Sequence, residues 1–363
     1  MIMPQTSIAP LPPPVPLDTS DILKALARAN RPLGELKGIA HSLPNQDILL
    51  DTLTLQEALA SSEIENIVTT QDEVYRADLS VNAGSMEAKE VARYRDAMRQ
   101  GYEAWQDKGF ISESMLINMF RLLKQRSNGY RRTPGTELRN EHTGQTVYVP
   151  PQDGRDIIAC MRDLERFIND DPSSDLDPLI KMALIHHQFE SIHPFPDGNG
   201  RIGRILNVLY LTHAGLLDSP ILYLSRAINR SRADYYRLLQ AVRDQNNWEE
   251  WVLYMLNAVA DTAKITLNLI ADIRDLMAST KQRMRQELPN IYSQDLLNNL
   301  FRHPYTRIEF VSRDLDVHYN TAISRLQALT QAKFVEEVRS GRSKYYINSE
   351  LANLLMRASA GNE

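Results

Sequence analysis

Twelve residues near the middle of the chain combine types that could bind and react with phosphates. Residues 193–204 read His-Pro-Phe-Pro-Asp-Gly-Asn-Gly-Arg-Ile-Gly-Arg. The prolines prevent a continuous helix, and Gly198, Asn199 and Gly200 most readily adopt left-handed backbone angles. Successive amides can then point into one concavity, to which a helix expected from Arg201 adds its free N–H groups. We therefore expect this loop to bind an anion.

The charged side chains of the same segment supply a metal ligand, a base and two cations. Arg201 and Arg204 are three residues apart, on neighbouring faces of a first helical turn. Cations there oppose the helix dipole, which is understandable if a polyphosphate lies between them. Asp197 is a hard oxygen ligand suited to Mg²⁺, and His193 is a base that titrates near neutrality. An ordinary helix–loop–helix turn explains each residue but not their combination, and the Walker pattern of a P-loop does not occur.

The segment resembles the Fic motif, H-x-F-x-[DE]-G-N-G-R-x-x-R, at every defined position. The resemblance to the helical Fic core covers about residues 90–260, including a lead-in helix that contains His187-Gln188-Phe189-Glu190. It implies a protein adenylyltransferase that moves AMP from Mg-ATP, with Mg²⁺ as cofactor, to a Ser, Thr or Tyr hydroxyl of a target protein. Removal of AMP and transfer of phosphate remain open, although Gly200 favours AMP transfer.

The resemblance also implies a role for each residue of the motif. His193 takes the proton from the target hydroxyl, and Asp197 holds Mg²⁺ against the α- and β-phosphates. Arg201 and Arg204 hold the β/γ end of the nucleotide and stabilise the leaving pyrophosphate. The residues predicted to bind ATP are Gly198, Asn199, Gly200, Arg201, Gly203, Arg204, Tyr235 and Tyr236.

Two of these expectations have a structural alternative. Tyr235 and Tyr236 resemble aromatic residues that flank adenine in relatives, but packing in the core would equally account for them. The segment 143–149 is predicted to form a hairpin that resembles the family's flap, which aligns a target segment by strand addition. An ordinary edge hairpin is the alternative. The flap residues are Thr146, Val147 and Tyr148.

A short pattern ahead of the Fic core resembles the family's inhibitory motif, [ST]-x-x-x-E-[GN]. Residues 61–66 read Ser-Ser-Glu-Ile-Glu-Asn, with Ser61 and Glu65 on one helix face. In relatives the glutamate pairs with the second arginine of the motif, here Arg204, in the place of the γ-phosphate. A solvated glutamate is the alternative. The predicted inhibitory residues are Ser61, Glu65 and Asn66.

The apolar pattern predicts a mainly α-helical protein with a Fic helical fold, a small β-hairpin flap and a C-terminal winged helix-turn-helix domain. Six prolines in residues 1–18 predict an extended tail. We expect an N-terminal helical region with the inhibitory motif over 19–90, the Fic core over 91–260, a linker helix over 261–288 and the winged helix over 289–363. Helices are expected over 51–68, 88–106, 112–125, 156–169, 178–191, 201–214, 231–245 and 248–288.

The winged helix is predicted from three helices and a two-stranded wing. Its recognition helix would cover 319–332 and the turn of its wing 339–344. Residues 303–349 hold seven Lys/Arg and five Asp/Glu, a mild excess for a DNA reader. DNA binding and protein binding or dimerisation both remain open. The candidate DNA contacts are Arg325, Arg339, Arg342 and Lys344.

Composition limits the classes of protein that fit. The 363 residues carry a net charge of −5 and one cysteine, which excludes an internal disulfide and argues against a general affinity for nucleic acid. No signal peptide and no membrane partner are expected, so we predict a cytoplasmic protein. The second class of function is a DNA-binding regulator whose Fic site senses nucleotide, and a homodimer is left open.

Overall fold

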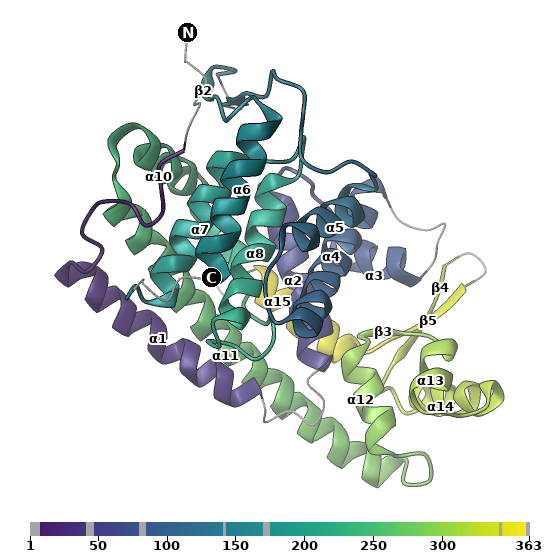
Figure 1. Cartoon of the computed structure of the whole chain (residues 1–363). Helices are drawn as coiled ribbons and strands as arrows, with labels where there is room; N and C mark the ends of the chain where they lie inside the picture. Colours follow the sequence, from purple (N-terminus) through teal and green to yellow (C-terminus); the bar gives the residue numbers. More distant parts are fainter. Residues whose placement is uncertain are drawn as a thin grey trace.

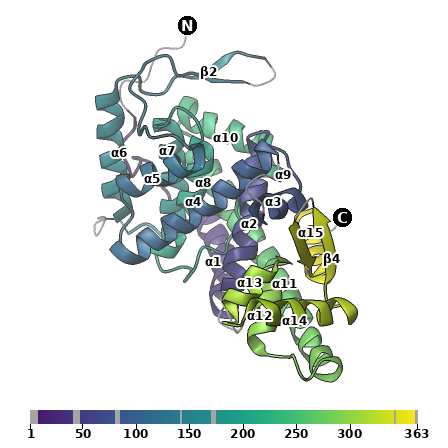
Figure 2. The same ribbon diagram turned by 90° about the vertical axis from the view of Figure 1, so that its right-hand side faces the viewer.

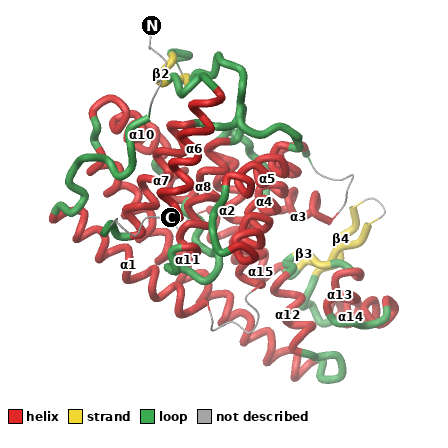
Figure 3. The backbone as a smooth tube through the Cα atoms, viewed as in Figure 1, coloured by secondary structure: helices red, strands yellow, loops and turns green. Residues whose placement is uncertain are grey.

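Helices dominate the protein, and strands occur at two separate places in the described chain (Figures 1 and 3). The computed structural model describes residues 8–40, 47–79, 85–140, 143–169, 175–340 and 343–360. This arrangement confirms the predicted mainly α-helical class. Within the described residues, no helix combines the length and the apolar character needed to span a bilayer.

Two buried helices form the centre of the fold. These are α7 (Pro178–Ile192) and α8 (Asn199–His213), in which nearly every residue is buried. Asp177 caps α7 by accepting a hydrogen bond from the amide of Leu179, as its position before Pro178 predicts. The two helices pack against each other, and the loop between them holds most of the predicted site.

The remaining helices of the body surround this pair. They are α1 (Ser20–Ala40), α2 (Asp47–Ile64), α3 (Gln71–Leu79), α4 (Met86–Lys108), α5 (Glu113–Lys124), α6 (Gly154–Asn169), α9 (Ser225–Arg230), α10 (Arg232–Gln245) and α11 (Trp248–Glu287). The first helix lies along the long α11, although they are far apart in sequence (Figure 1). Helix α2 lies against α4 and α9, which places it beside the central pair.

The C-terminal domain follows α11. It contains α12 (Gln294–Arg302), β3 (Tyr305–Thr306), α13 (Ile308–Asp314), α14 (Tyr319–Gln331), β4 (Glu336–Ser340), β5 (Ser343–Ile347) and α15 (Ser349–Ala360). The strands form an antiparallel sheet in the order β3-β5-β4. The three helices and the hairpin occur in the predicted order, and β3 and α15 are additions. Figure 2 shows this domain on one side of the body, next to α2.

Several predicted boundaries were wrong. Helix α2 begins and ends four residues earlier than the range 51–68, because Asn66 adopts a left-handed angle (φ 59°) that stops the helix. Helix α8 begins at Asn199 rather than at Arg201. The predicted helix 231–245 is preceded by a separate short helix, α9.

The described part of the proline-rich tail is not loosely attached to the body. Pro13 and Leu17 are buried, and Gln188 donates a hydrogen bond to the carbonyl of Ala9 (2.9 Å). Proline residues restrict the unfolded chain, so fixing this segment costs less conformational entropy than fixing an ordinary tail. The tail is therefore part of the packed structure from residue 8 onward.

Candidate functional site

Local backbone geometry shapes the loop between α7 and α8. His193 ends α7 in a left-handed conformation (φ 49°), and Gly198 precedes α8 in another (φ 75°). The buried side chain of Asn199 closes the loop, since its Oδ1 accepts from the amide of Phe195 and its Nδ2 donates to the carbonyl of Phe195, both at 2.8 Å. The loop thus keeps its shape through its own residues. The backbone amides at the start of α8 can donate hydrogen bonds to an anion.

Arg131, which the sequence did not reveal, supports the same loop from outside. Its side chain is buried and donates to the backbone carbonyls of Ile192, His193 and Pro151. Its own amide donates to the carbonyl of Pro194 (2.8 Å). A buried guanidinium with several carbonyl partners is costly to remove, so Arg131 is a structural support of the loop.

His193 lies in an environment that keeps it neutral. Burial lowers the pKa of His193 to about 3, and the charges of Arg131 and Arg243 act in the same direction. Within the described residues, its buried Nδ1 has no hydrogen-bond partner. A neutral imidazole can accept a proton, which is the state that a general base requires.

A chain of alternating charges connects Asp197 to Arg201. Asp197 Oδ2 lies 2.6 Å from Lys124 Nζ, and Lys124 Nζ lies 2.8 Å from Glu90 Oε1. The same Glu90 oxygen lies 2.6 Å from Nη1 of Arg201, whose side chain is only 2% exposed. Asp197 Oδ1 accepts from the amide of Gly198 at 2.6 Å. Burial would raise the pKa of Asp197, but Lys124 outweighs burial and holds that pKa below its usual value.

Arg204 is bound by the predicted inhibitory residues. Its Nη2 donates to Glu65 Oε1 at 2.8 Å and to the carbonyl of Ser61 at 2.8 Å, and its Nε donates to Ser61 Oγ at 2.8 Å. The guanidinium is almost fully buried. Burial alone would lower the pKa of Arg204, but the charge of Glu65 reverses this and holds that pKa above its ordinary value. Ser61 and Glu65 thus occupy three donor positions of Arg204.

The carboxylate of Glu65 also lies directly over the glycine of the loop. A Cβ placed on Gly200 would lie 2.4 Å from Glu65 Oε1 and 2.9 Å from Arg204 Nη1. Only a residue without a side chain permits this approach. Asn66, the third predicted inhibitory residue, ends the turn after α2 and accepts from Arg232 Nη1 through its Oδ1 at 2.9 Å. The inhibitory pattern therefore faces the start of α8.

Helix α2 is anchored in the body by a second carboxylate, Glu57. Its Oε1 accepts from the hydroxyl of Tyr94 at 2.9 Å and from that of Ser225, and its Oε2 accepts from the amide of Ser225 at 3.0 Å. Burial raises the pKa of Glu57 to about 7, although these hydrogen bonds oppose the shift. Glu57 lies about one helical turn before Ser61, so this anchor fixes the part of α2 that meets Arg204.

The two tyrosines predicted to flank adenine have different environments. Tyr235 is 1% exposed and its hydroxyl lies 2.8 Å from Nε2 of the buried His186, so it belongs to the core. This burial favours the packing alternative, and contact of Tyr235 with adenine stays a prediction. Tyr236 is 44% exposed; burial is the main cause that raises the pKa of Tyr236 to about 12, and the charge of Glu65 adds to the shift. Gly203, predicted to bind phosphate, packs against α7, because a Cβ there would lie 2.9 Å from Glu190 Oε1.

The predicted hairpin is present as β1 (Leu138–Arg139) and β2 (Thr146–Tyr148), which pair antiparallel. The carbonyl of Val147 accepts from Gln240 of α10 at 3.1 Å. Tyr148 is buried beneath the guanidinium of Arg243, whose carbon lies 4.1 Å from the ring centre. The hairpin is therefore joined to α10, close to the end of α7 that carries His193.

The candidate DNA contacts of the C-terminal domain are partly neutralised. Arg339 Nε and Lys344 Nζ both pair with Glu337 Oε1, at 3.3 Å and 3.0 Å. Arg325 is half-buried on α14, and Arg342 lies outside the described residues. Of the described candidates, Arg339 and Lys344 thus share one carboxylate, which offsets part of their charge.

Comparison with known proteins agrees with this geometry. Residues 23–103 match the family described as "Fic/DOC family N-terminal", and residues 110–211 match "Fic/DOC family". Residues 276–351 match "Protein adenylyltransferase SoFic-like, C-terminal domain". The three matches follow one another along the chain and together include the inhibitory pattern, the motif loop and the C-terminal domain.

Among curated proteins, the chain is 30% identical over 174 residues to a probable protein adenylyltransferase of Aquifex aeolicus, covering 47% of this chain and 51% of that protein. It is 31% identical over 135 residues to the protein adenylyltransferase Fic of Drosophila melanogaster, covering 37% of this chain and 25% of that protein. The chain thus spans about half the length of the first relative and a quarter of the second.

Solved structures share the fold. A Fic family protein from Desulfovibrio desulfuricans has a TM-score of 0.56 at 24% identity, covering 91% of this chain and 96% of that chain. A Fic domain containing signaling protein from Bacteroides thetaiotaomicron has a TM-score of 0.55 at 18% identity, covering 68% of this chain and 97% of that chain. These likenesses show a shared fold. The three family matches, which together cover most of the chain, show that the chain belongs to the Fic family.

Proposed function

We propose that this protein is an adenylyltransferase that moves AMP from ATP to a hydroxyl of a target protein, and that Glu65 inhibits it. The observation that carries the proposal is the contact of Glu65 with both Arg204 and Gly200. An inhibitory carboxylate placed over an arginine and a glycine loop is expected where a phosphate group competes for the same position. The relatives named as protein adenylyltransferases support the transfer of AMP.

The residues of the loop suit an in-line displacement at the α-phosphorus. His193, neutral at physiological pH, would accept the proton of the attacking hydroxyl as the new bond to phosphorus forms. The bond between the α-phosphorus and the bridging oxygen would break, and pyrophosphate would leave. Arg201 and Arg204 would neutralise its charge, since buried guanidiniums stabilise phosphate oxygens strongly.

The donor set at the mouth of the loop fits a magnesium ion. Asp197 is a carboxylate whose side chain is 53% exposed, and it would hold the ion together with phosphate oxygens of the nucleotide and water. When bound, Mg²⁺ would neutralise phosphate charge and orient the nucleotide. Lys124 already occupies Asp197 Oδ2, so its contact must weaken when Asp197 binds a cation.

The proposed inhibition follows from charge and space together. A γ-phosphate would need the donors of Arg204 that Ser61 and Glu65 occupy. The carboxylate of Glu65 would also repel a phosphate placed at Gly200. ATP can therefore bind in a reactive position only when Glu65 moves away. The target is a protein that presents a hydroxyl; DNA binding and a homodimer are not part of this proposal.

The test is AMP transfer by Glu65→Gly, incubated with ATP labelled at the α-phosphate and a cell lysate. We expect labelled protein bands to increase by about 100-fold over the unchanged protein. Mass spectrometry of the labelled bands identifies the transferred group, because AMP and phosphate differ in mass. A target that gains the mass of phosphate and no α-label would overturn AMP transfer.

Two variants control this experiment. Glu63→Gly changes an exposed glutamate on the same helix that does not contact Arg204, so it should leave the rate unchanged. Glu65→Gly combined with His193→Ala should lose the label. Equal stimulation by Glu63→Gly and Glu65→Gly would show that a loosened helix, and not the lost carboxylate, accounts for the rate.

A further inference from the structure

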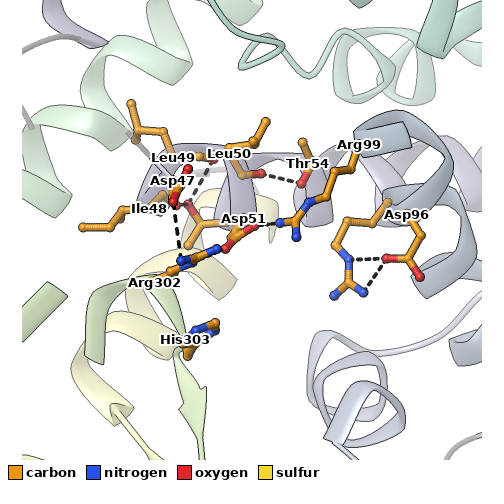
Figure 4. A network of polar contacts seen from close by, with 12 residues as sticks. Asp47, Ile48, Leu49, Leu50, Asp51, Thr54, Asp96, Arg99, Arg302 and His303 are labelled. Carbon is orange, nitrogen blue, oxygen red and sulfur yellow. Dashed lines mark hydrogen bonds and ion pairs between the residues drawn. The ribbon is translucent and has the colours of Figure 1, made fainter. Parts of the chain in front are cut away.

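The C-terminal domain contacts the first turn of the inhibitory helix α2 through Arg302. Nε of Arg302, the last residue of α12, lies 2.7 Å from Asp51 Oδ2, and its Nη1 lies 3.4 Å from Asp47 Oδ2 (Figure 4). Asp51 is 13% exposed and Arg302 28%, so the pair is largely shielded from water. A shielded pair is screened less by salt than a surface pair.

Asp51 joins three elements at this point. Its Oδ1 also pairs with Arg99 of α4, so one carboxylate receives guanidiniums from the body and from the C-terminal domain (Figure 4). Burial lowers the pKa of Arg99, and the charge of Arg302 adds to that shift. The charges of Arg99 and Arg302 repel each other, and the carboxylate of Asp51 between them offsets this repulsion. The position of α12 is therefore coupled to that of α2.

The C-terminal domain makes a second contact with the body, at a helix that follows the inhibitory residues in the sequence. The hydroxyl of Tyr305, in β3, donates to Asp72 Oδ1 of α3 at 2.8 Å. The ring of Tyr305 stacks on Tyr75, with centres 4.6 Å apart and planes 14° from parallel. Helix α3 begins shortly after Asn66, so the C-terminal domain contacts the chain both before and after Glu65.

We propose that the C-terminal domain holds α2 against the motif loop through Arg302 and Tyr305, and thereby sets the level of inhibition by Glu65. This inference rests on the proposed function, because it concerns the same inhibitory contact. Helix α2 is attached near its first turn at Asp51, and the chain that follows it is attached at Asp72 of α3, so Glu65 lies between two contacts with the C-terminal domain. Weakening either attachment therefore raises the population in which Glu65 has left the loop.

The experiment compares three variants of the full chain. Arg302→Leu removes both ion pairs but keeps the aliphatic volume, and Tyr305→Phe removes the bond to Asp72 but keeps the stack. The control, Arg313→Leu, alters an exposed arginine whose contacts with Asp314 and the ring of Phe310 lie within the same domain. The readouts are AMP transfer from labelled ATP and hydrogen exchange of the α2 amides.

We expect Arg302→Leu to raise AMP transfer about fivefold, with a smaller rise for Tyr305→Phe and none for Arg313→Leu. Amide exchange in α2 should accelerate in the same order. In the Glu65→Gly background, Arg302→Leu should add nothing, because the carboxylate through which it acts has been removed. If Arg302→Leu does not fold, Tyr305→Phe alone decides the outcome.

Two results would overturn the inference. One is unchanged exchange in α2 together with unchanged transfer in both variants. The other is an equal gain in the Glu65→Gly background, which would place the effect outside the inhibitory contact. Failure of the proposed function is recognised separately, since Glu65→Gly itself would then leave transfer unchanged while exchange still reports whether the C-terminal domain holds α2.

Discussion

The motif loop and the inhibitory helix meet at one point but are stabilised in different ways. The loop of residues 193–204 obtains much of its shape from its own chain, through Gly198 and through Asn199 bonded to Phe195. Helix α2 depends on partners far away in sequence, from α4, α9 and α12. The proposed chemistry is thus encoded in a short segment, whereas its proposed control by Glu65 requires the assembled fold.

The largest expected effect comes from replacing His193, the proposed general base of the loop. In the Glu65→Gly background, His193→Ala should lower kcat for AMP transfer by about 10³-fold, because the proton of the attacking hydroxyl loses its acceptor. Binding of a fluorescent ATP analogue should stay the same, since His193 is not expected to hold the nucleotide. A loss of affinity with kcat retained would show that the imidazole binds substrate instead.

The anchor of the inhibitory helix should show a dependence on pH. Burial raises the pKa of Glu57 to about 7 in the folded protein, so between pH 4.5 and 7 the folded state binds more protons than the unfolded state. The contribution of protonated Glu57 to the free energy of unfolding is therefore present at low pH and is lost as pH rises to about 7. Relative to Glu57→Gln, the unchanged protein should lose about 3 kcal/mol of unfolding free energy over this range.

Chemical denaturation of both proteins at several pH values measures this difference. The titration of Glu190, whose pKa burial also raises to about 7, occurs in both proteins and cancels. Parallel stability profiles for the two proteins would contradict the assignment of a raised pKa to Glu57.

The ion pairs that connect Asp197 to Arg201 through Lys124 and Glu90 should have a smaller effect. This effect concerns the concentration of Mg²⁺ that the protein requires. Lys124→Met removes the ammonium that competes with a cation for Asp197. The concentration of Mg²⁺ that gives half-maximal binding of an ATP analogue should fall about fivefold. Lys108→Met, at an exposed lysine of α4, is the control. An unchanged or increased requirement would mean that Lys124 assists cation binding.

The smallest effect concerns a single hydrogen bond between the two regions. Ser61→Ala removes the hydroxyl that accepts from Arg204 Nε and should raise AMP transfer about threefold, well below the effect of Glu65→Gly. Ser62→Ala is a matched control, because the buried hydroxyl of Ser62 has no hydrogen-bond partner in the described chain. An equal response to both substitutions would assign the effect to the helix rather than to the bond.

The sequence predicted the helical class and the hairpin, because periodicity and short patterns report local preferences. The pairing of Glu65 with Arg204 was expected only from the resemblance of residues 61–66 to the family's inhibitory motif. It did not separate Tyr235 from Tyr236, which are adjacent on α10 but differ in burial. It also missed Glu57, Lys124 and Arg131. Single charged residues on helices or in loops leave no pattern, so no local signal could have identified them.

The amino-acid sequence by itself determined the chemistry of the loop, because the glycines, the asparagine and the charged residues that shape it lie within twelve consecutive positions. Only the tertiary structure decided which distant carboxylates act on that loop: Glu65 on Arg204, and Glu90 on Arg201. The physical reason is how far apart in the sequence the interacting residues lie. Backbone conformation is set by neighbours in the chain, whereas an ion pair in a shielded interior is set by which helices pack together.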